Sequence, residues 1–212
     1  MKILFQGDSI THGGRVESDW DFNHTLGHGY VFNITGEIIA KNTENDYVFI
    51  NKGINGNRVV DLYARWKEDT ISLKPDLLSI LIGSNDLTSE KNFRSTSNKV
   101  FERTYDLLIK DIKDELPNTK IVLCEPFRLD LNTDKYKLEV ETKEDLLEKQ
   151  KISYAMSQKY NTAYVPLQSI FNKVALLKPA INWMWDGVHP TAAGHYLIAR
   201  QWISIVSDKK WL

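Results

Sequence analysis

The sequence contains one cysteine, Cys124, so no disulfide can form within the chain. It also lacks an apolar run long enough to cross a membrane, and no small-residue cleavage site follows the apolar start Met1-Lys2-Ile3-Leu4-Phe5. These absences predict a cytoplasmic protein that is not inserted in a membrane. The formal net charge of −1 provides no overall field that would attract nucleic acid. Cys124 itself lies inside an apolar run and is expected to be a small buried side chain.

What the chain does have is enough apolar sequence, 42% of 212 residues, for one domain (1–212) with a sizeable core. Five short runs rich in Ile, Val and Leu are typical of strands buried on both faces, namely 2–6, 47–51, 77–82, 120–124 and 163–165. Helical spacing of apolar residues lies between them, as at 59–66, 101–116 and 198–205. The alternation predicts an α/β fold with a doubly wound, flavodoxin-like parallel sheet, whose sites lie beyond the carboxyl ends of the strands.

Three polar segments do not follow this pattern. Residues 12–29 are rich in Gly and aromatics and predict a long loop, while the charged segment 127–144 fits a loop, a short helix or a contact between subunits. The charge run 139–151 is typical of a solvated helix face. His24 and His28 have the spacing of metal ligands, but no third ligand is evident and the neighbouring glycines disfavour a helix, so no metal is expected.

The tetrapeptide Gly7-Asp8-Ser9-Ile10 directly follows the first predicted strand. A turn at that point exposes the hydroxyl of Ser9 at the strand's carboxyl end, and Gly7 permits the tight backbone that such a turn needs. Ser9 is therefore a candidate nucleophile. The alternative is an ordinary helix cap, in which Asp8 or Ser9 accepts hydrogen bonds from free amides of the next helix.

A base for that nucleophile is offered by Asp186-Gly187-Val188-His189-Pro190. A serine hydroxyl needs a base, a neutral imidazole can take its proton, and a carboxylate fixes the tautomer of the imidazole. An aspartate three residues before a histidine can fold back to reach the ring within one loop. The alternative is that Asp186 and His189 only cap and orient the helix that follows Thr191.

Two further loops, 51–57 and 83–86, follow the second and third predicted strands. Acyl transfer places negative charge on the carbonyl oxygen and needs donors already aimed at it. The Gly56 backbone amide, the Asn85 side-chain amide and the backbone N–H of Ser9 suit this role. The alternative is turn chemistry, since Gly and Asn tolerate left-handed backbone.

Together these motifs resemble the four sequence blocks of the SGNH hydrolases, also called the GDSL esterase/lipase family, and they span Gly7 to His189. The resemblance implies a three-layer α/β/α fold with five parallel strands. It implies a triad of Ser9, Asp186 and His189, an oxyanion hole of Ser9, Gly56 and Asn85, and neither a metal nor an organic cofactor. The first block reads Gly-Asp-Ser-Ile where the family has Gly-Asp-Ser-Leu, which is a near-isosteric change.

A finer resemblance concerns the substrate. The stretches 13–15, 27–31, 58–66 and 125–127, and the tryptophan before Asp186, are similar to bacterial carbohydrate acetylesterases such as acetylxylan esterases, some of which are intracellular oligomers. The implied partner is a small-molecule or oligosaccharide ester, and homo-oligomerisation stays open. Trp183 and Trp185 offer flat faces to a sugar ring, or pack in the core. Asp8, Arg58 and Glu125 are further substrate-binding candidates, although Arg58 and Glu125 could simply pair with each other.

Two other readings are compatible with the sequence. A lipase, arylesterase or thioesterase would use the same triad with a longer acyl pocket. A non-catalytic carbohydrate-binding protein could retain the hydrolase fold, although every catalytic residue type is present here.

Overall fold

A parallel five-stranded sheet forms the centre of the computed structural model, which describes residues 1–17, 24–87, 95–133 and 136–212. Its strand order is β2-β1-β3-β4-β5, and every neighbouring pair is parallel. The strands are β1 (Lys2–Gly7), β2 (Val48–Asn51), β3 (Leu77–Leu81), β4 (Lys120–Cys124) and β5 (Ala163–Val165). Each coincides with one of the five predicted apolar runs, and the order is the flavodoxin-like one that was expected.

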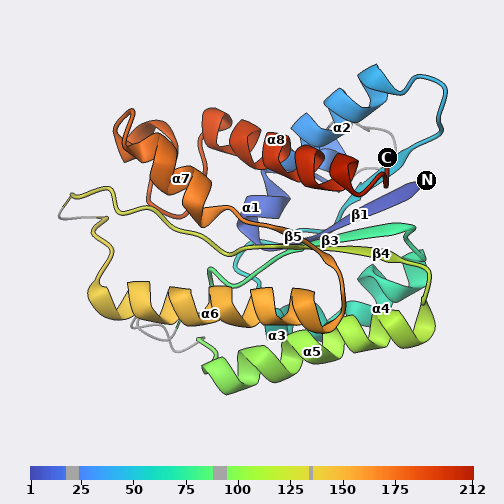
Figure 1. The fold of residues 1–212 in the computed structure, drawn as a ribbon, viewed down its shortest axis with the longest axis horizontal. Helices are drawn as coiled ribbons and strands as arrows, with labels where there is room; N and C mark the ends of the chain where they lie inside the picture. The colour runs from blue at the N-terminus through green and yellow to red at the C-terminus, as the bar shows by residue number, and fades with distance from the viewer. Residues whose placement is uncertain (18–23, 88–94, 134–135) are drawn as a thin grey trace.

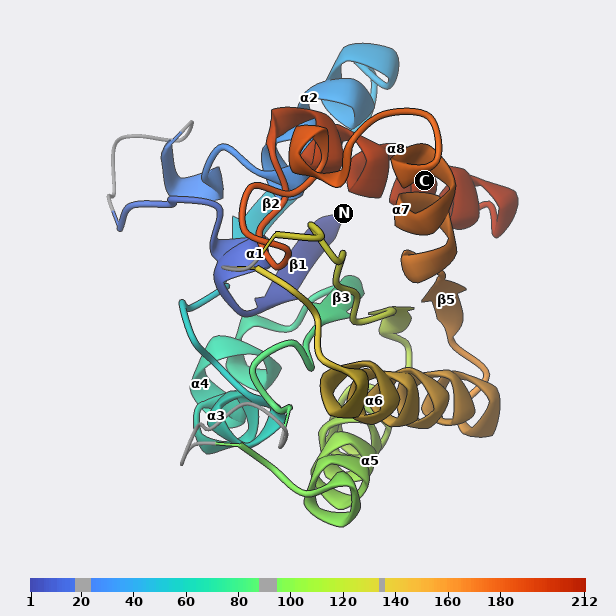
Figure 2. The same ribbon diagram turned by 90° about the vertical axis from the view of Figure 1, so that its left-hand side faces the viewer.

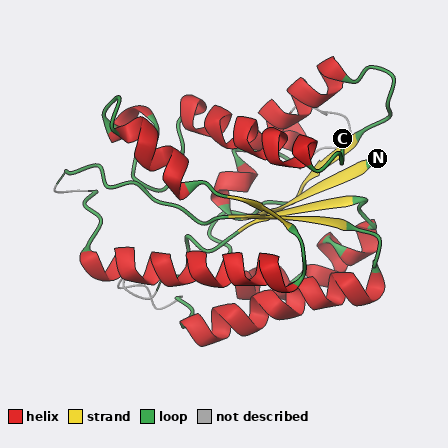
Figure 3. Cartoon of the chain, in the orientation of Figure 1, coloured by secondary structure: helices red, strands yellow, loops and turns green. Residues whose placement is uncertain are grey.

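Helices cover both faces of the sheet and make three layers (Figures 1 and 3). The layer drawn above the sheet in Figure 1 contains α2 (Tyr30–Lys41), α7 (Gln168–Ala175) and α8 (Ala192–Asp208). The layer below contains α3 (Val59–Ala64), α4 (Trp66–Asp69), α5 (Asn98–Glu115) and α6 (Val140–Lys159). Figure 2 looks onto the carboxyl ends of the strands, where the short helix α1 (Ser9–His12) continues from β1.

The core is divided by the sheet, because successive side chains of a strand point to opposite faces. Phe5 joins the cluster under α2 and α8, where its ring centroid lies 5.5 Å from that of Trp202. Leu4 joins the cluster formed with α3 to α6. The buried indole of Trp202 donates to the Ser79 hydroxyl at 3.0 Å, so a polar atom inside the sheet is satisfied by the helix that covers it.

Helix boundaries follow local signals. Ser97 caps α5 by accepting from the Val100 amide, and the predicted apolar stripe of this helix is buried. Thr191 caps α8 as expected, accepting from the Gly194 amide. The helical pattern predicted at 59–66 is interrupted at Arg65, which separates α3 from α4.

The polar segments are only partly loops. Residues 12–29 include the end of α1 and the 3-10 turn η1 (His24–Leu26), with 18–23 outside the described residues. Segment 127–144 is irregular until α6 begins at Val140, with 134–135 outside the described residues. The prediction of a solvated helix face at 139–151 is wrong for Lys149, whose side chain is fully buried. Its ammonium can be buried because it donates to the Thr96 carbonyl at 2.9 Å and to Asn98 at 2.6 Å.

Cys124 is fully buried at the end of β4, as predicted. Burial raises the pKa of its thiol to about 12, and its sulfur lies 3.7 Å from the Ser79 hydroxyl. A thiol of that pKa stays protonated and unreactive at neutral pH. In the part of the chain that the structure describes, no helix combines the length and the apolar composition needed to cross a membrane.

Candidate active site

Ser9 is the first residue of α1, directly beyond the carboxyl end of β1. The Asp8 carboxylate caps this helix by accepting from the Ile10 amide at 2.9 Å. Gly7 permits the close turn, because a Cβ on Gly7 would lie 2.2 Å from the Thr11 hydroxyl oxygen and 2.4 Å from the Leu81 carbonyl oxygen. The cap predicted as an alternative to catalysis therefore exists, and it is made by Asp8 while the hydroxyl of Ser9 points elsewhere.

That hydroxyl lies 2.8 Å from Nε2 of His189, although the two residues are 180 positions apart in the sequence. Nδ1 of His189 lies 2.6 Å from Oδ2 of Asp186, and Oδ1 of Asp186 accepts from the backbone amides of Val188 and His189. Gly187 adopts a φ of 84°, which lets the loop fold back over three residues. The structure thus joins the three predicted triad residues in one hydrogen-bonded line.

The charge state of Asp186 follows from these contacts. Burial alone would raise the pKa of the carboxyl, but the hydrogen bonds from the His189 amide, the His189 ring and the Val188 amide outweigh it and lower the pKa. Asp186 is therefore an anion at neutral pH. An anionic acceptor at Nδ1 keeps the proton on that nitrogen and leaves the lone pair of Nε2 directed at Ser9, as general-base action requires.

The loops after β2 and β3 meet beside Ser9. Gly56 has a φ of 74° in the first loop, and Asn85 lies in the second. Nδ2 of Asn85 donates to the Asn57 carbonyl at 3.1 Å and lies 3.4 Å from Oδ2 of Asp8, the residue that precedes Ser9. Asp86 holds the second loop against α3, because its carboxylate accepts from the Val59 amide at 3.2 Å and from the Thr96 hydroxyl.

Asp8 and Asp86 are both buried carboxyls. Asp8 is 1% exposed, and burial raises its pKa to about 7; the pKa of Asp86 is raised to about 6 for the same reason. Asp8 was a candidate for binding substrate, but its carboxylate has almost no surface to offer and instead contacts the Ile10 amide and Asn85. Asp8 therefore lies in the interior, directly before Ser9 in the chain.

The other substrate-binding candidates lie in different surroundings. Arg58 binds Asp61 through Nε and Nη2, both at 2.9 Å, within the first turn of α3. Glu125 instead accepts from the Leu167 and Gln168 amides, both at 2.7 Å, where α7 begins. A carboxylate at that place satisfies free amides of a helix start. The pairing of Arg58 with Glu125 that the sequence allowed is thus not formed.

The two tryptophans before the triad loop have separate roles. Trp185 is 53% exposed, and its ring stacks on that of His189 with centroids 5.3 Å apart and planes 16° apart. Trp183 is partly buried against the cluster under α8. Its carbonyl accepts from the Thr191 amide, and a Cβ on Gly194 would lie 2.2 Å from that carbonyl oxygen. Trp185 therefore presents a half-exposed aromatic face beside His189, and Trp183 packs behind the loop that holds Asp186.

Several buried groups near the site were not identified from the sequence. Arg128 is 8% exposed, and its Nη2 donates to the Ser84 carbonyl at 2.7 Å, next to Asn85. His195 accepts from the Tyr30 amide, and burial lowers its pKa to about 4, so it stays neutral near His189. Arg128 lies in a segment whose charges show no period, so only tertiary contact marks it.

His24 and His28, the candidate metal ligands, lie side by side. The two rings lie 5.4 Å apart in an edge-on arrangement. Across residues 1–17, 24–87, 95–133 and 136–212, no group of three or more His, Cys, Asp or Glu side chains is placed to hold a metal ion.

A flavodoxin-like α/β sheet carrying a Ser–His–Asp line at the carboxyl ends of its strands is the architecture of a serine hydrolase. Comparison with known proteins gives the family. Residues 5–197 match the GDSL-like lipase/acylhydrolase family. An acetylxylan esterase from Geobacillus stearothermophilus is 35% identical over 207 residues, which cover 95% of this chain and 92% of the relative. The chain belongs to the GDSL-like lipase/acylhydrolase family and is a carboxylic ester hydrolase of the serine esterase type.

Solved structures agree with that assignment. A crystal structure of a candidate GDSL-like lipase from Parabacteroides merdae superposes with a TM-score of 0.90 at 36% identity, covering 97% of this chain and 95% of that one. The structure of an acetylxylan esterase from Geobacillus stearothermophilus gives a TM-score of 0.84 at 32% identity, covering 97% and 93%. At these identities the likeness extends to the family as well as the fold.

Proposed function

We propose that this esterase removes acetyl groups from a carbohydrate such as acetylated xylo-oligosaccharides, through an acyl-enzyme on Ser9. The mechanism is supported by two hydrogen bonds, one between Ser9 Oγ and His189 Nε2 (2.8 Å) and one between His189 Nδ1 and Asp186 Oδ2 (2.6 Å). Support for the substrate comes from the relative described as an acetylxylan esterase. Solved structures of an acetylxylan esterase also include catalytic mutants in which a serine, an aspartate and a histidine are each replaced by alanine.

The reaction runs in two halves. Oγ of Ser9 forms a bond to the ester carbonyl carbon while its proton moves to Nε2 of His189. Negative charge on the carbonyl oxygen is met by the backbone amides of Ser9 and Gly56 and the side chain of Asn85. The C–O bond to the sugar then breaks, and His189 returns the proton to the leaving alcohol. Water attacks the acetyl-enzyme by the same route, and acetate and free Ser9 result.

The sugar would lie on Trp185. This ring is half-exposed and stacked on His189, so a flat apolar surface borders the reacting atoms. Aromatic faces of this kind suit the apolar faces of pyranose rings. The similarity to an acetylxylan esterase favours a substrate with a small acetyl group over one with a long acyl chain. A cytoplasmic location stays a prediction of the sequence.

The test is hydrolysis of p-nitrophenyl acetate and of acetylated xylo-oligosaccharides by the wild type, by Ser9→Ala and by Ser207→Ala, which changes an exposed serine of α8. We expect Ser9→Ala to be inactive but folded, Ser207→Ala to be fully active, and a fluorophosphonate to label Ser9. Full activity in Ser9→Ala would rule out the mechanism. An ester series of increasing acyl length tests the substrate, because faster turnover of long chains would favour the lipase or thioesterase alternative.

A further inference from the structure

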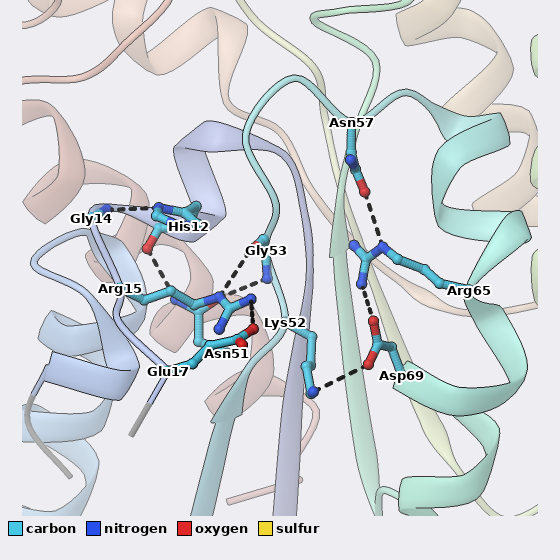
Figure 4. Close-up of polar contacts among 10 residues, drawn as sticks. All are labelled: His12, Gly14, Arg15, Glu17, Asn51, Lys52, Gly53, Asn57, Arg65 and Asp69. Atoms are coloured by element: carbon cyan, nitrogen blue, oxygen red, sulfur yellow. Dashed lines mark hydrogen bonds and ion pairs between the residues drawn. The ribbon is translucent and has the colours of Figure 1, made fainter. Parts of the chain in front are cut away.

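Arg65 occupies the break between α3 and α4, and its side chain points toward Asn57, in the loop after β2, and toward Asp69 (Figure 4). Its backbone has a φ of −117° and a ψ of 13°, outside the regular helix. Nε of Arg65 donates to the side-chain oxygen of Asn57 at 3.0 Å, and Nη1 donates to Asp69 at 2.9 Å. The side chain is only 15% exposed, so both contacts lie largely away from water.

Asn57 is the residue through which Arg65 reaches the site. Its backbone amide donates to the Ile54 carbonyl at 3.2 Å and closes the turn that contains Gly56. Its own carbonyl accepts from Nδ2 of Asn85 at 3.1 Å. Asn57 thus fixes both the turn that contains Gly56 and the side chain of Asn85. The side chain of Asn57 is in turn held by Arg65.

Asp69 anchors Arg65 to the ends of two strands. The same carboxylate binds Lys52 at 3.1 Å, just beyond β2 (Figure 4). The Asp69 carbonyl accepts from the side chain of Gln6 at 2.8 Å, and Gln6 belongs to β1, which leads into Ser9. The anchor of Arg65 is therefore tied to the strands on which the nucleophile and the Gly56 loop are built.

The electrostatics of Arg65 and Asp69 point in opposite directions. Burial lowers the pKa of the Arg65 guanidinium in spite of the hydrogen bond and charge of Asp69, whereas for Asp69 burial is outweighed by hydrogen bonds from Arg65 and Lys52, which lower its pKa. Nη2 is also buried without a hydrogen-bond partner among the residues that the structure describes. A buried ion pair often contributes no more stability than apolar side chains of similar volume. An arginine in this place is better explained by the geometry that its planar fork imposes.

We propose that Arg65 is a positioning residue of the esterase reaction: by holding Asn57, it orients the Gly56 turn and the Asn85 amide toward the oxyanion. Arg65 does not touch the substrate. The inference rests on the proposed function, because it assigns Gly56 and Asn85 to the oxyanion hole. It is testable separately, since loss of this role leaves Ser9, His189 and Asp186 in place.

The experiment compares Arg65→Met and Asn57→Ala, singly and together, with the wild type on p-nitrophenyl acetate. Misplaced donors act on the transition state more than on bound substrate, so we expect kcat to fall about 10–100-fold, less than the full loss of a donor, with KM within about twofold. Because both changes break the same contact, the double variant should be no slower than the slower single variant. Circular dichroism and thermal melting check the fold.

Two further variants sharpen the result. Asn57→Asp keeps an oxygen acceptor for Nε of Arg65 and should retain most of the wild-type kcat. Arg103→Met makes the same substitution on the exposed side of α5 and should change nothing. If Arg65→Met does not fold, the comparison of Asn57→Ala with Asn57→Asp still tests the proposal.

The proposal is overturned if kcat is unchanged in folded Arg65→Met, if only KM rises, if the losses add in the double variant, or if Asn57→Asp is as slow as Asn57→Ala. None of these results affects the proposed function, which stands or falls on Ser9→Ala and on labelling of Ser9. An inactive wild type would instead refute the proposed function before Arg65 is tested.

Discussion

Replacing the buried Asp8 by asparagine should remove a loss of stability that the wild type undergoes between pH 4 and pH 8. The pKa of Asp8 is raised from 3.8 to about 7, chiefly because burial disfavours its charged form, and the Ile10 amide and His189 offset only part of this. The folded state therefore binds the proton of Asp8 more tightly than the unfolded chain does. The stability that Asp8 contributes is fully present below pH 3.8 and is lost as the pH rises to about 7.

The size of the effect follows from the difference in pKa. A change from 3.8 to about 7 is about three pH units, and each unit corresponds to about 1.4 kcal/mol, so the total is roughly 4 kcal/mol. Asparagine does not ionise, and its oxygen can still accept from the Ile10 amide. The free energy of unfolding of Asp8→Asn minus that of the wild type should thus increase by up to roughly 4 kcal/mol between pH 4 and pH 8.

The assay is urea unfolding of both proteins at pH 4, 6 and 8. Asp106→Asn provides a control with a pKa shift of opposite sign: burial acts to raise the pKa of Asp106, but hydrogen bonds from Lys159 and Tyr160 outweigh it and lower the pKa. Because its pKa is lowered from 3.8, Asp106 changes protonation below the assayed range, so the difference between this variant and the wild type should stay nearly constant from pH 4 to pH 8. If the difference between Asp8→Asn and the wild type is flat over this range, Asp8 titrates as in the unfolded chain, and the account of its burial is wrong.

Three further predictions concern catalysis and packing. Asp186→Asn should lower kcat about 10³–10⁴-fold with the fold intact, because His189 loses the acceptor that fixes its tautomer, and unchanged steady-state kinetics would refute that role. Ser79→Ala should destabilise the protein by about 1–3 kcal/mol in urea unfolding, since it leaves the buried indole N–H of Trp202 unpaired; an unchanged midpoint would count against it. Gly53→Ala places a Cβ 2.3 Å from the His12 amide nitrogen and should lower the free energy of unfolding by about 1–3 kcal/mol. The melting temperature should fall, and an unchanged melting temperature would contradict the prediction.

The sheet could be predicted from the sequence because its signals are local, and the candidate triad because its short motifs together resemble those of a known family. Each strand is a short apolar run, and Asp186 and His189 lie three residues apart in one loop. The helix α2 was not identified, although Tyr30, Val31, Ile34 and Ile38 form a buried stripe at helical spacing that could have revealed it. The surrounding Gly-rich segment obscured that pattern.

The supporting residues could not be predicted, because nothing in their local sequence distinguishes them from surface charges. Lys149 lies in a run of charged residues, yet it is fully buried because Thr96 and Asn98 meet its ammonium from outside its own helix. Arg65 and Arg128 likewise act through contacts with loops that are distant in the sequence. Such contacts depend on how loops pack at the sheet's edge, which composition and periodicity do not encode.

Asp186 and His189 lie in one short hairpin, which is closed by an antiparallel bridge between Met184 and Pro190 and by the hydrogen bond from the Trp185 amide to the His189 carbonyl. Asp186 and His189 consequently move together, and among these three residues only the distance from His189 to Ser9 depends on tertiary packing. If that hairpin detached from the rest of the fold, the hydrogen bond between Ser9 and His189 would be lost and the esterase would be inactive, although His189 and Asp186 would remain paired.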